Sequence, residues 1–101
     1  MNCGNVLILP KAAEDLEKGR TFYDAQGPNI GDYFWDCLIA DIESLLFYAG
    51  IHERHHGFYK MLAKRFPYAI YYDIVDDAAR VAAILPMRRD PAWIVQQLDN
   101  R

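Results

Sequence analysis

One segment, rich in aromatic and β-branched residues, has an apolar side chain at nearly every position: Arg65-Phe66-Pro67-Tyr68-Ala69-Ile70-Tyr71-Tyr72-Asp73-Ile74-Val75. Side chains alternate between the two faces of a strand. One face therefore carries Tyr68, Ile70, Tyr72 and Ile74, and the other carries Ala69, Tyr71 and Val75. A strand that is apolar on both faces usually lies inside a sheet and is covered by helices on at least one side. We therefore expect this segment to be the central strand, with regular pairing only after Pro67, whose nitrogen carries no proton to donate.

The length and composition set the class of protein. The chain has 101 residues, which fits one domain over residues 1–101, and it is 52% hydrophobic and 25% charged, as globular chains are. No apolar run approaches the roughly 20 residues that a membrane-spanning helix needs, and residues 1–5 lack the features of a signal peptide. Cys3 and Cys37 do not require an oxidising compartment. We expect a cytoplasmic protein with no membrane contact.

The residues before the central segment predict a strand and two helices. A short apolar run from Asn5 to Leu9 reads as a first strand, and Pro10 suits the first turn of the helix that follows. Gly19 weakens this helix by about 1 kcal/mol relative to alanine. It could also allow another helix to approach closely, which the sequence does not decide. The Gln26-Gly27-Pro28 sequence stops it.

A second, longer helix is expected to start at Asn29, with Asn29 as its cap and Asp32 as the capping-box partner. Apolar side chains recur at three and four residues from Ile30 to Ala49, so this helix has a stripe to bury. The two helices should form an antiparallel hairpin.

The second half of the chain predicts the rest of a sheet. Residues 51–57 read as a polar connection, and a strand follows from about Phe58 to Ala63. Residues 76–79 make a plausible hairpin turn that lacks the Asn-Gly or Asp-Gly signature, and residues 80–85 form the next strand. Asp90-Pro91 provides a cap and a first-turn proline for a final helix. The expected fold is α+β in the order β-α-α-β-β-β-α: a helical hairpin packed on a four-stranded, mainly antiparallel sheet, with a short C-terminal helix.

The net charge of −3 is unevenly distributed. Residues 1–57 carry 4 Lys/Arg against 9 Asp/Glu, a balance of −5, and residues 58–101 carry 7 against 5, a balance of +2. Proteins that work by gripping nucleic acid usually have a stronger basic footprint, so this balance counts against an RNA substrate without excluding it.

Six cations lie on or beside the predicted strands: Lys60, Lys64, Arg65, Arg80, Arg88 and Arg89. Several could project from the sheet face that the helical hairpin leaves uncovered. Clustered guanidinium and ammonium groups suit phosphate, a nucleic-acid backbone or an acidic partner segment. The alternative is that they are ordinary solvated side chains, and residue types alone do not decide between the two.

The other chemically capable residues are better explained by structure. His52, His55 and His56 have a spacing that could bind a metal, but nothing around them completes a zinc motif, so a solvated loop is favoured. Cys37 could pair with a histidine as a nucleophile, yet it lies on the apolar stripe, which favours core packing. We expect neither a metal nor a cofactor, since no glycine-rich phosphate loop is present.

Three tyrosines in the central segment, Tyr68, Tyr71 and Tyr72, could stack on bases or act as acids. Tyrosines in such a segment more often fill a core and keep the hydroxyl at its edge. We favour core packing for at least Tyr68 and Tyr72.

Two segments together resemble a known family. Arg65-Phe66-Pro67-Tyr68-Ala69-Ile70-Tyr71-Tyr72 resembles the central strand of RelE/ParE-type toxins, and Arg88-Arg89-Asp90-Pro91-Ala92-Trp93-Ile94 looks like their C-terminal signature. The hairpin, with Ala13-Glu14-Asp15-Leu16 and Phe22-Tyr23, also fits. The resemblance implies a small bacterial toxin of a type II toxin–antitoxin system, held inactive in a hetero-oligomeric complex by an antitoxin encoded beside it.

The resemblance also implies one of two mechanisms. Members similar to RelE cleave mRNA in the ribosomal A site with basic residues on the middle strands and a late Tyr or His, which would assign catalysis here to Lys60, Arg65, Arg88 and Arg89. Ala69 takes the place of the third-strand arginine, and Trp93 that of the late acid or base, and neither can do that work.

Members similar to ParE instead inhibit DNA gyrase and cleave nothing themselves. We prefer this interpretation, with DNA gyrase as the target, because two positions of the nuclease set are replaced. The third possibility is a degenerate member that binds its antitoxin but no longer poisons the cell.

Overall fold

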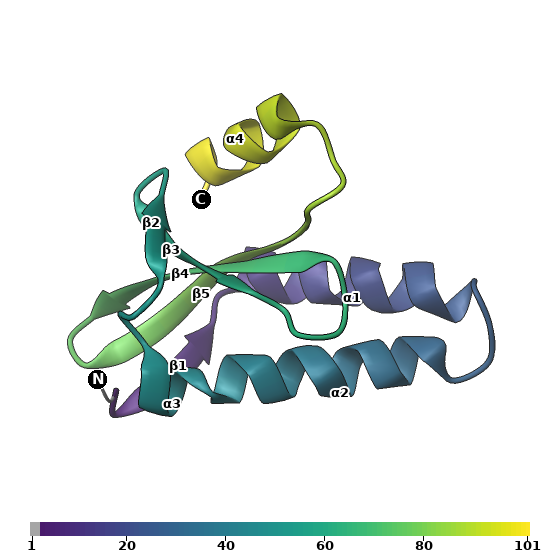
Figure 1. Ribbon diagram of the computed structural model, residues 1–101, viewed down its shortest axis with the longest axis horizontal. Helices are drawn as coiled ribbons and strands as arrows, with labels where there is room; N and C mark the ends of the chain where they lie inside the picture. Colours follow the sequence, from purple (N-terminus) through teal and green to yellow (C-terminus); the bar gives the residue numbers. More distant parts are fainter. Residues whose placement is uncertain (1–2) are drawn as a thin grey trace.

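Four helices and a five-stranded sheet make up the computed structural model, which describes residues 3–101 (Figure 1). The elements are β1 (Asn5–Ile8), α1 (Pro10–Asp24), α2 (Ile30–Glu43), α3 (Leu45–Tyr48), β2 (Glu53–His55), β3 (Phe58–Leu62), β4 (Tyr68–Val75), β5 (Ala78–Pro86) and α4 (Pro91–Asp99). The strand order is β1-β5-β4-β3-β2, in which β1 runs parallel to β5 and the other pairs are antiparallel. The predicted α+β architecture is confirmed.

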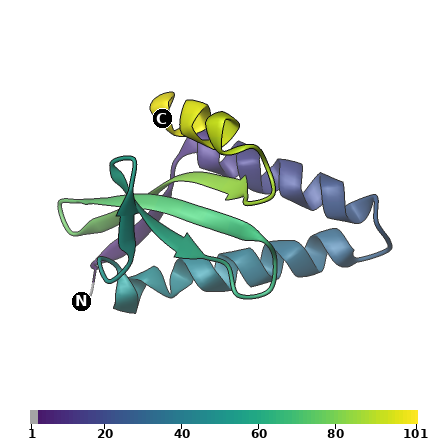
Figure 2. The same ribbon diagram turned by 45° about the horizontal axis from the view of Figure 1, so that its top comes forward.

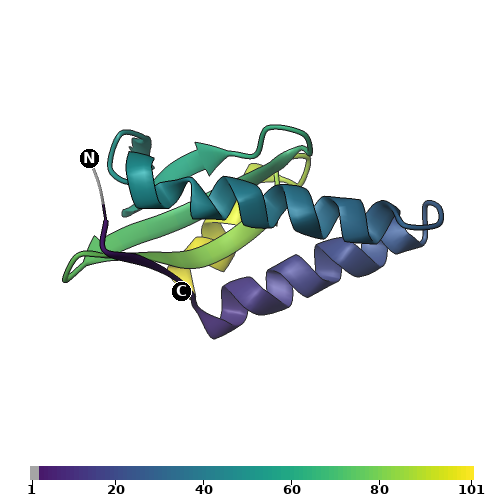
Figure 3. The same ribbon diagram turned by 90° about the horizontal axis from the view of Figure 1, so that it is seen from below.

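The elements form three layers, with the sheet in the middle. The α1–α2 hairpin covers one face, which we call the hairpin face, and α4 lies over the other, which we call the α4 face (Figures 1 and 2). Seen from below, α1 and α2 lie side by side across the sheet, and their connected ends extend beyond the strands (Figure 3). None of the helices in residues 3–101 is long and apolar enough to cross a membrane.

The predicted central strand is β4, which lies between β3 and β5. Its residues from Tyr68 to Tyr72 are all buried, as the apolar pattern on both faces predicts. Regular pairing begins at Tyr68, directly after Pro67, whose carbonyl accepts the Met87 N–H. The expectation about Pro67 is therefore confirmed.

The hairpin packs closely on itself and on the sheet. Gly19 of α1 faces Phe34 of α2, and a Cβ added at Gly19 would lie 2.5 Å from the Phe34 ring. The close approach of a second helix at Gly19, which the sequence left open, is therefore observed. Phe34 is fully buried and stacks against Tyr23, with Phe66 and Tyr68 edge-on to it.

Two local predictions are wrong. Residues 51–57 are not only a connection, because β2 forms within them and pairs with β3, which makes five strands and not four. All three residues of β2 are exposed, so no alternation of apolar and polar side chains marks the strand.

The helix start at Asn29 is in the right place but is built differently. Asn29 has a left-handed backbone (φ 65°) and its side chain makes no capping bond. Instead the Asp24 carboxylate accepts the Gly31 N–H at 3.0 Å, and Asp32 pairs with Arg20 at 2.6 Å. The capping box is therefore wrong, and a carboxylate from the end of α1 takes the role of the cap.

The turn between β4 and β5 is tighter than its sequence indicates. Both Asp76 (φ 49°) and Asp77 (φ 65°) have positive φ, as in the two-residue turns that favour Asn-Gly. The predicted hairpin is confirmed, with β5 starting at Ala78 and not at Arg80.

Candidate functional site

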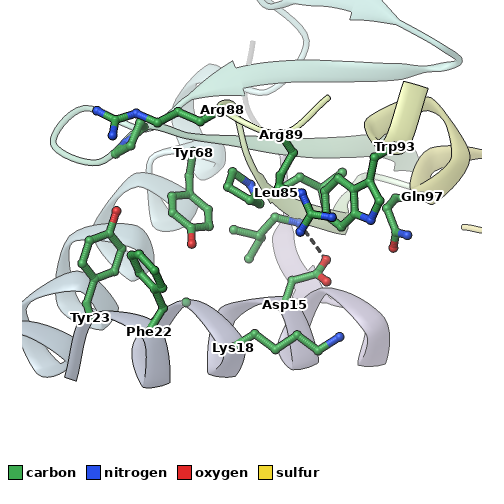
Figure 4. A pocket seen from close by; sticks show the side chains of 14 residues that line it. Asp15, Lys18, Phe22, Tyr23, Tyr68, Leu85, Arg88, Arg89, Trp93 and Gln97 are labelled. Atoms are coloured by element: carbon green, nitrogen blue, oxygen red, sulfur yellow. Dashed lines mark hydrogen bonds between the residues drawn. The ribbon is translucent and has the colours of Figure 1, made fainter. Parts of the chain in front are cut away.

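A cleft lies between α1, the edge of β5 and α4, and its volume is about 450 Å³. Phe22 and Tyr23 project into it from α1, Tyr68 from β4, and Trp93 from α4, so that four aromatic rings surround it (Figure 4). Three cations stand among these rings: Lys18, Arg88 and Arg89. We call this the α1–α4 cleft.

The cleft exists because β5 has no strand beside its second half. β1 stops at Ile8, opposite Val81, so the backbone of β5 from Ala82 onward faces α1 and the end of α4. Its backbone polar groups that lack a strand partner are satisfied by side chains: Asp15 accepts the Ile84 N–H at 3.0 Å, and Arg101 donates to the Ala82 carbonyl at 2.8 Å. The open edge is thereby closed to further strand pairing at these groups.

Asp15 and Arg101 also pair with each other. Two guanidinium nitrogens of Arg101 donate to the two Asp15 oxygens, at 2.6 and 3.1 Å. Both side chains are more than nine-tenths buried (7% exposed for Arg101 and 9% for Asp15). A bidentate pair of this kind has a fixed geometry, so it holds the end of α4 against α1 and β5.

The three cations of the cleft are available to a ligand. The Arg89 guanidinium lies over the Trp93 ring, 3.9 Å from its centre, and no described residue forms an ion pair with Lys18, Arg88 or Arg89. A guanidinium stacked on an indole keeps its edge free to bind a carboxylate or phosphate. The cleft therefore suits a group that is anionic and apolar at once.

The tyrosines of the cleft are weaker acids than an ordinary tyrosine. Burial, with smaller contributions from Tyr23 and Asp15, raises the pKa of Tyr68 to about 12. Burial also raises the pKa of Tyr23, and the nearby Arg88 cation offsets this only in part. Both hydroxyls are neutral at physiological pH. The prediction that Tyr68 and Tyr72 are core residues is confirmed, since they are 7% and 0% exposed.

The predicted cations do not gather in one place. Arg88 and Arg89 line the α1–α4 cleft, whereas Lys60 lines a second cleft at the β3 edge and Arg65 a third beside α2. Lys64 lines both of the latter clefts. Arg80 is paired with Asp73, at 2.8 and 2.7 Å, so it is not free.

The position of the third-strand arginine in the nuclease pattern is covered. Ala69 is 0% exposed and lies in a buried cluster on the α4 face with Tyr71, Ala83, Leu85 and Leu98. Trp93 and Ile94 of α4 pack against the same cluster. In this conformation no anion reaches the sheet at Ala69.

The three histidines do not converge on one point. Nδ1 of His52 lies 2.5 Å from the Tyr72 hydroxyl, His55 lies near Glu53, and His56 contacts Asp99 at 3.0 Å. Burial lowers the pKa of His52. Among residues 3–101 no group of three or more His, Cys, Asp or Glu side chains is arranged to hold a metal ion.

Cys37 is half-buried and lines the third cleft, outside the buried clusters, so its predicted core packing is wrong. No histidine lines that cleft, and the Cys–His alternative has no geometric support.

Sequence reasoning missed Asp15 and Arg101, the buried pair behind the cleft. They are separated by 86 positions in the chain. Arg101 stands in no motif, and Asp15 stands only in the hairpin segment 13–16. An acidic residue on the apolar side of the α1 pattern was the available signal, since a buried carboxylate needs a partner.

The comparisons with known proteins give the fold and not a sequence family. No family model matches the sequence, and no curated protein matches it. The structure is similar to a chain of the chromosomal ParDE TA system from P. aeruginosa, with a TM-score of 0.75 at 16% sequence identity. The match covers 83% of this chain and 96% of that chain. The fold that the β4 and α4 segments imply by their resemblance to RelE/ParE-type toxins is thereby confirmed.

Proposed function

We propose that this protein is the toxin of a type II toxin–antitoxin pair, and that it stops growth by binding and poisoning DNA gyrase. The observation that carries the proposal is α4, which covers the sheet face at Ala69 in a fold shared with the ParDE protein. Because α4 covers this face of the sheet and no free cation lies at Ala69, a binding protein is favoured over a nuclease. The protein would act in the cytoplasm, where gyrase works.

The alternative is a ribosome-dependent mRNA endoribonuclease of RelE type. It would need Lys60, Arg65, Arg88 and Arg89 around one phosphate, yet these four residues line three separate clefts. It would also need a proton donor or acceptor within hydrogen-bond reach, and burial makes Tyr23 and Tyr68 weaker acids than an ordinary tyrosine by raising the pKa of each. The geometry therefore supports this alternative less well.

The α1–α4 cleft is the site that we assign to the antitoxin. Its aromatic rings and its free cations, Lys18, Arg88 and Arg89, suit a segment that carries both large apolar and acidic side chains. Such a segment would bury Phe22, which is 55% exposed. The resulting hetero-oligomer would be the resting form of the protein.

Growth on induction tests toxicity and neutralisation together. Induced alone, the protein should stop growth, and co-expression of the neighbouring reading frame should restore it. The double variant Arg88→Glu with Arg89→Glu should remain toxic in the presence of the antitoxin, because two attractive contacts become repulsive. Arg65→Glu, an exposed arginine outside the cleft, is the matched control and should be neutralised normally.

Normal growth of the strain that expresses the wild-type protein alone would favour a degenerate, non-toxic protein. Toeprinting on translating ribosomes separates the two toxic mechanisms. The proposal predicts that the wild-type protein makes no cuts in the ribosomal A site. If it does cut there, and if the cuts disappear in Lys60→Ala, the protein cleaves mRNA and gyrase poisoning is the wrong mechanism.

A further inference from the structure

A single hydroxyl of the central strand holds the turn that joins α3 to β2. Tyr72 is fully buried in β4, and its oxygen accepts the Gly50 N–H at 2.9 Å and lies 2.5 Å from Nδ1 of His52. The rings of Tyr72 and His52 meet edge-on, with 5.6 Å between their centres. The hydroxyl therefore contacts the turn on both sides of Ile51.

The proton of this hydroxyl can be placed by counting donors and acceptors. A phenol has one proton to donate, and the Gly50 N–H already donates to the Tyr72 oxygen. Burial raises the pKa of Tyr72, and the Gly50 N–H offsets this only in part, so the phenol keeps its proton at neutral pH. Among residues 3–101, the other hydrogen-bond partner of the hydroxyl is Nδ1 of His52, and the Tyr72 proton is therefore donated there.

The His52 ring must be neutral for this contact to form. Nδ1 can accept the Tyr72 proton only if it carries none itself, which places the imidazole proton on Nε2. A second proton on the ring would make Nδ1 a donor, and the Tyr72 oxygen would then face two donors while its own proton lost its acceptor. Because a buried hydroxyl without an acceptor is costly, protonation of His52 opposes the closed turn.

His52 lies among groups of both charges. The other charged or titratable side chains of its cleft are Asp41 of α2, Tyr48 of α3, Glu53 and His55 of β2, Lys60 of β3 and Lys64 after it, and Cys3 and Tyr59 lie beside Tyr72. The two carboxylates and the two lysines balance in formal charge, and burial is the cause that lowers the pKa of His52. Folding thus favours the neutral imidazole.

Few other contacts hold the turn and the strand that follows it. β2 lies at the edge of the sheet, where it pairs with β3 alone, and its three residues are exposed. In the turn, the Ile51 N–H bonds to the Tyr48 carbonyl at 3.2 Å, but the Ile51 side chain is 65% exposed. Segments with few buried contacts open locally while the core stays folded. Loss of the Tyr72 contact should therefore free this edge and leave β4 intact.

We infer that His52 and Tyr72 form a latch that acid opens, so that protonation of His52 releases the turn from β4 and, with it, the edge strand β2. The inference goes beyond the proposed function and does not depend on the target of the protein. Once β2 is released, β3 becomes the edge strand, with its backbone open from Phe58 to Lys60. The sheet edge that the protein presents thus depends on pH.

NMR and hydrogen exchange of the purified wild-type protein test the latch. At pH 7.5 the nitrogen chemical shifts of His52 should show the proton on Nε2. The stabilisation by the neutral ring is complete above the ordinary histidine pKa of 6.5 and is lost as the pH falls through the lowered pKa of His52. Between pH 7.5 and pH 5 the protection factor of the Gly50 amide should therefore fall by about tenfold, because the open turn binds a proton that the closed turn excludes. Amides in β4 should keep their protection.

Three variants separate the latch from a contact that is only structural. His52→Asn keeps an acceptor near the position of Nδ1 but cannot be protonated, so its Gly50 amide should stay protected at both pH values. Tyr72→Phe removes the hydroxyl, and its Gly50 amide should be poorly protected at both. His55→Asn makes the same change at an exposed histidine of β2 and is the matched control, in which Gly50 should lose protection in acid as in the wild type.

Four results would overturn the inference. The first two, both in the wild type, are a proton on Nδ1 of His52 at pH 7.5 and Gly50 protection that does not change at pH 5. The third is an acid response in His52→Asn as large as that of the wild type, or its loss in His55→Asn. The fourth is a loss of protection in β4 by the same factor, since acid would then unfold the whole domain and no separate latch would exist.

Discussion

The two faces of the sheet are buried in different ways. The hairpin face is filled by large side chains from both layers, among them Leu16, Phe34, Leu38, Ile70 and Tyr72, and all of these are at most 1% exposed. On the α4 face the sheet contributes two alanines, a tyrosine and a leucine, and α4 contributes a single buried residue, Leu98. Apolar burial thus holds the hairpin face, and α4 must be positioned by other means.

Those other means are polar contacts at the two ends of α4. Asp90 caps the helix by accepting the Ala92 N–H at 3.0 Å. At the far end Arg101 pairs with Asp15, His56 contacts Asp99 at 3.0 Å, and Lys11 donates to the Asn100 carbonyl at 3.1 Å. The difference between the faces teaches that one side of the sheet stabilises the fold, while the other sets the shape of the α1–α4 cleft through a few specific contacts.

The largest expected effect lies in the hairpin face. Phe34→Ala should lower the free energy of unfolding by about 3–5 kcal/mol, since it removes a buried ring from the densest part of the core. Leu98→Ala on the α4 face should cost about 2 kcal/mol, because α4 can settle toward the sheet. Urea unfolding of the two variants measures the contrast, and equal losses would contradict the difference between the faces.

The next effect concerns the buried pair that joins the faces. Asp15→Ala should cost about 3 kcal/mol, because it leaves the buried Arg101 cation and the Ile84 N–H without a partner. Removing both charges, in Asp15→Leu with Arg101→Leu, should recover part of this loss. Urea unfolding of the single and double variants tests the pairing, and a double variant that loses the full sum of both single changes would argue against it.

A pH effect follows from Tyr68, which lies on the hairpin face at the wall of the cleft. Its folded-state pKa of about 12 lies above the ordinary value of 10.0, so folding favours the neutral phenol. The stabilisation is complete below pH 10 and is lost as the pH rises toward 12, because the unfolded chain ionises first. From pH 9 to pH 11, the urea midpoint of unfolding should fall further for the wild type than for Tyr68→Phe. Equal slopes would mean that Tyr68 does not carry the effect.

The smallest effect is the cap of α4. Asp90→Ala should cost about 1 kcal/mol, the usual value for a lost helix cap. We expect the loss to be local, so that hydrogen exchange becomes faster in α4 while amides in α2 keep their protection. Faster exchange in α2 by the same factor would show that the two faces unfold as one unit.

Most of the fold could be predicted because burial leaves a pattern in the sequence. The central strand followed from apolar side chains on both faces of residues 68–75, and the hairpin from its helical stripe. β2 could not be predicted, because Glu53, Arg54 and His55 are all exposed and show no apolar pattern. They are recognisable as a strand only by their pairing with β3. The replacement of the Asn29 cap by Asp24 is likewise a tertiary contact, set by how α1 ends against α2.

The site was only partly predictable for a similar reason. Arg88 and Arg89 were found from the tail signature, and they do line a cleft. Asp15 and Arg101 were missed because the chain brings them together only when the second half of β5 is left without a strand partner.

The most direct measurement of the account is made with purified protein, DNA gyrase and supercoiled DNA. A toxin that poisons gyrase should block supercoiling and leave cleaved DNA bound to the enzyme, and the cognate antitoxin should abolish both effects. Undisturbed supercoiling with no cleaved complex, from a preparation that stops growth in the cell, would contradict the account.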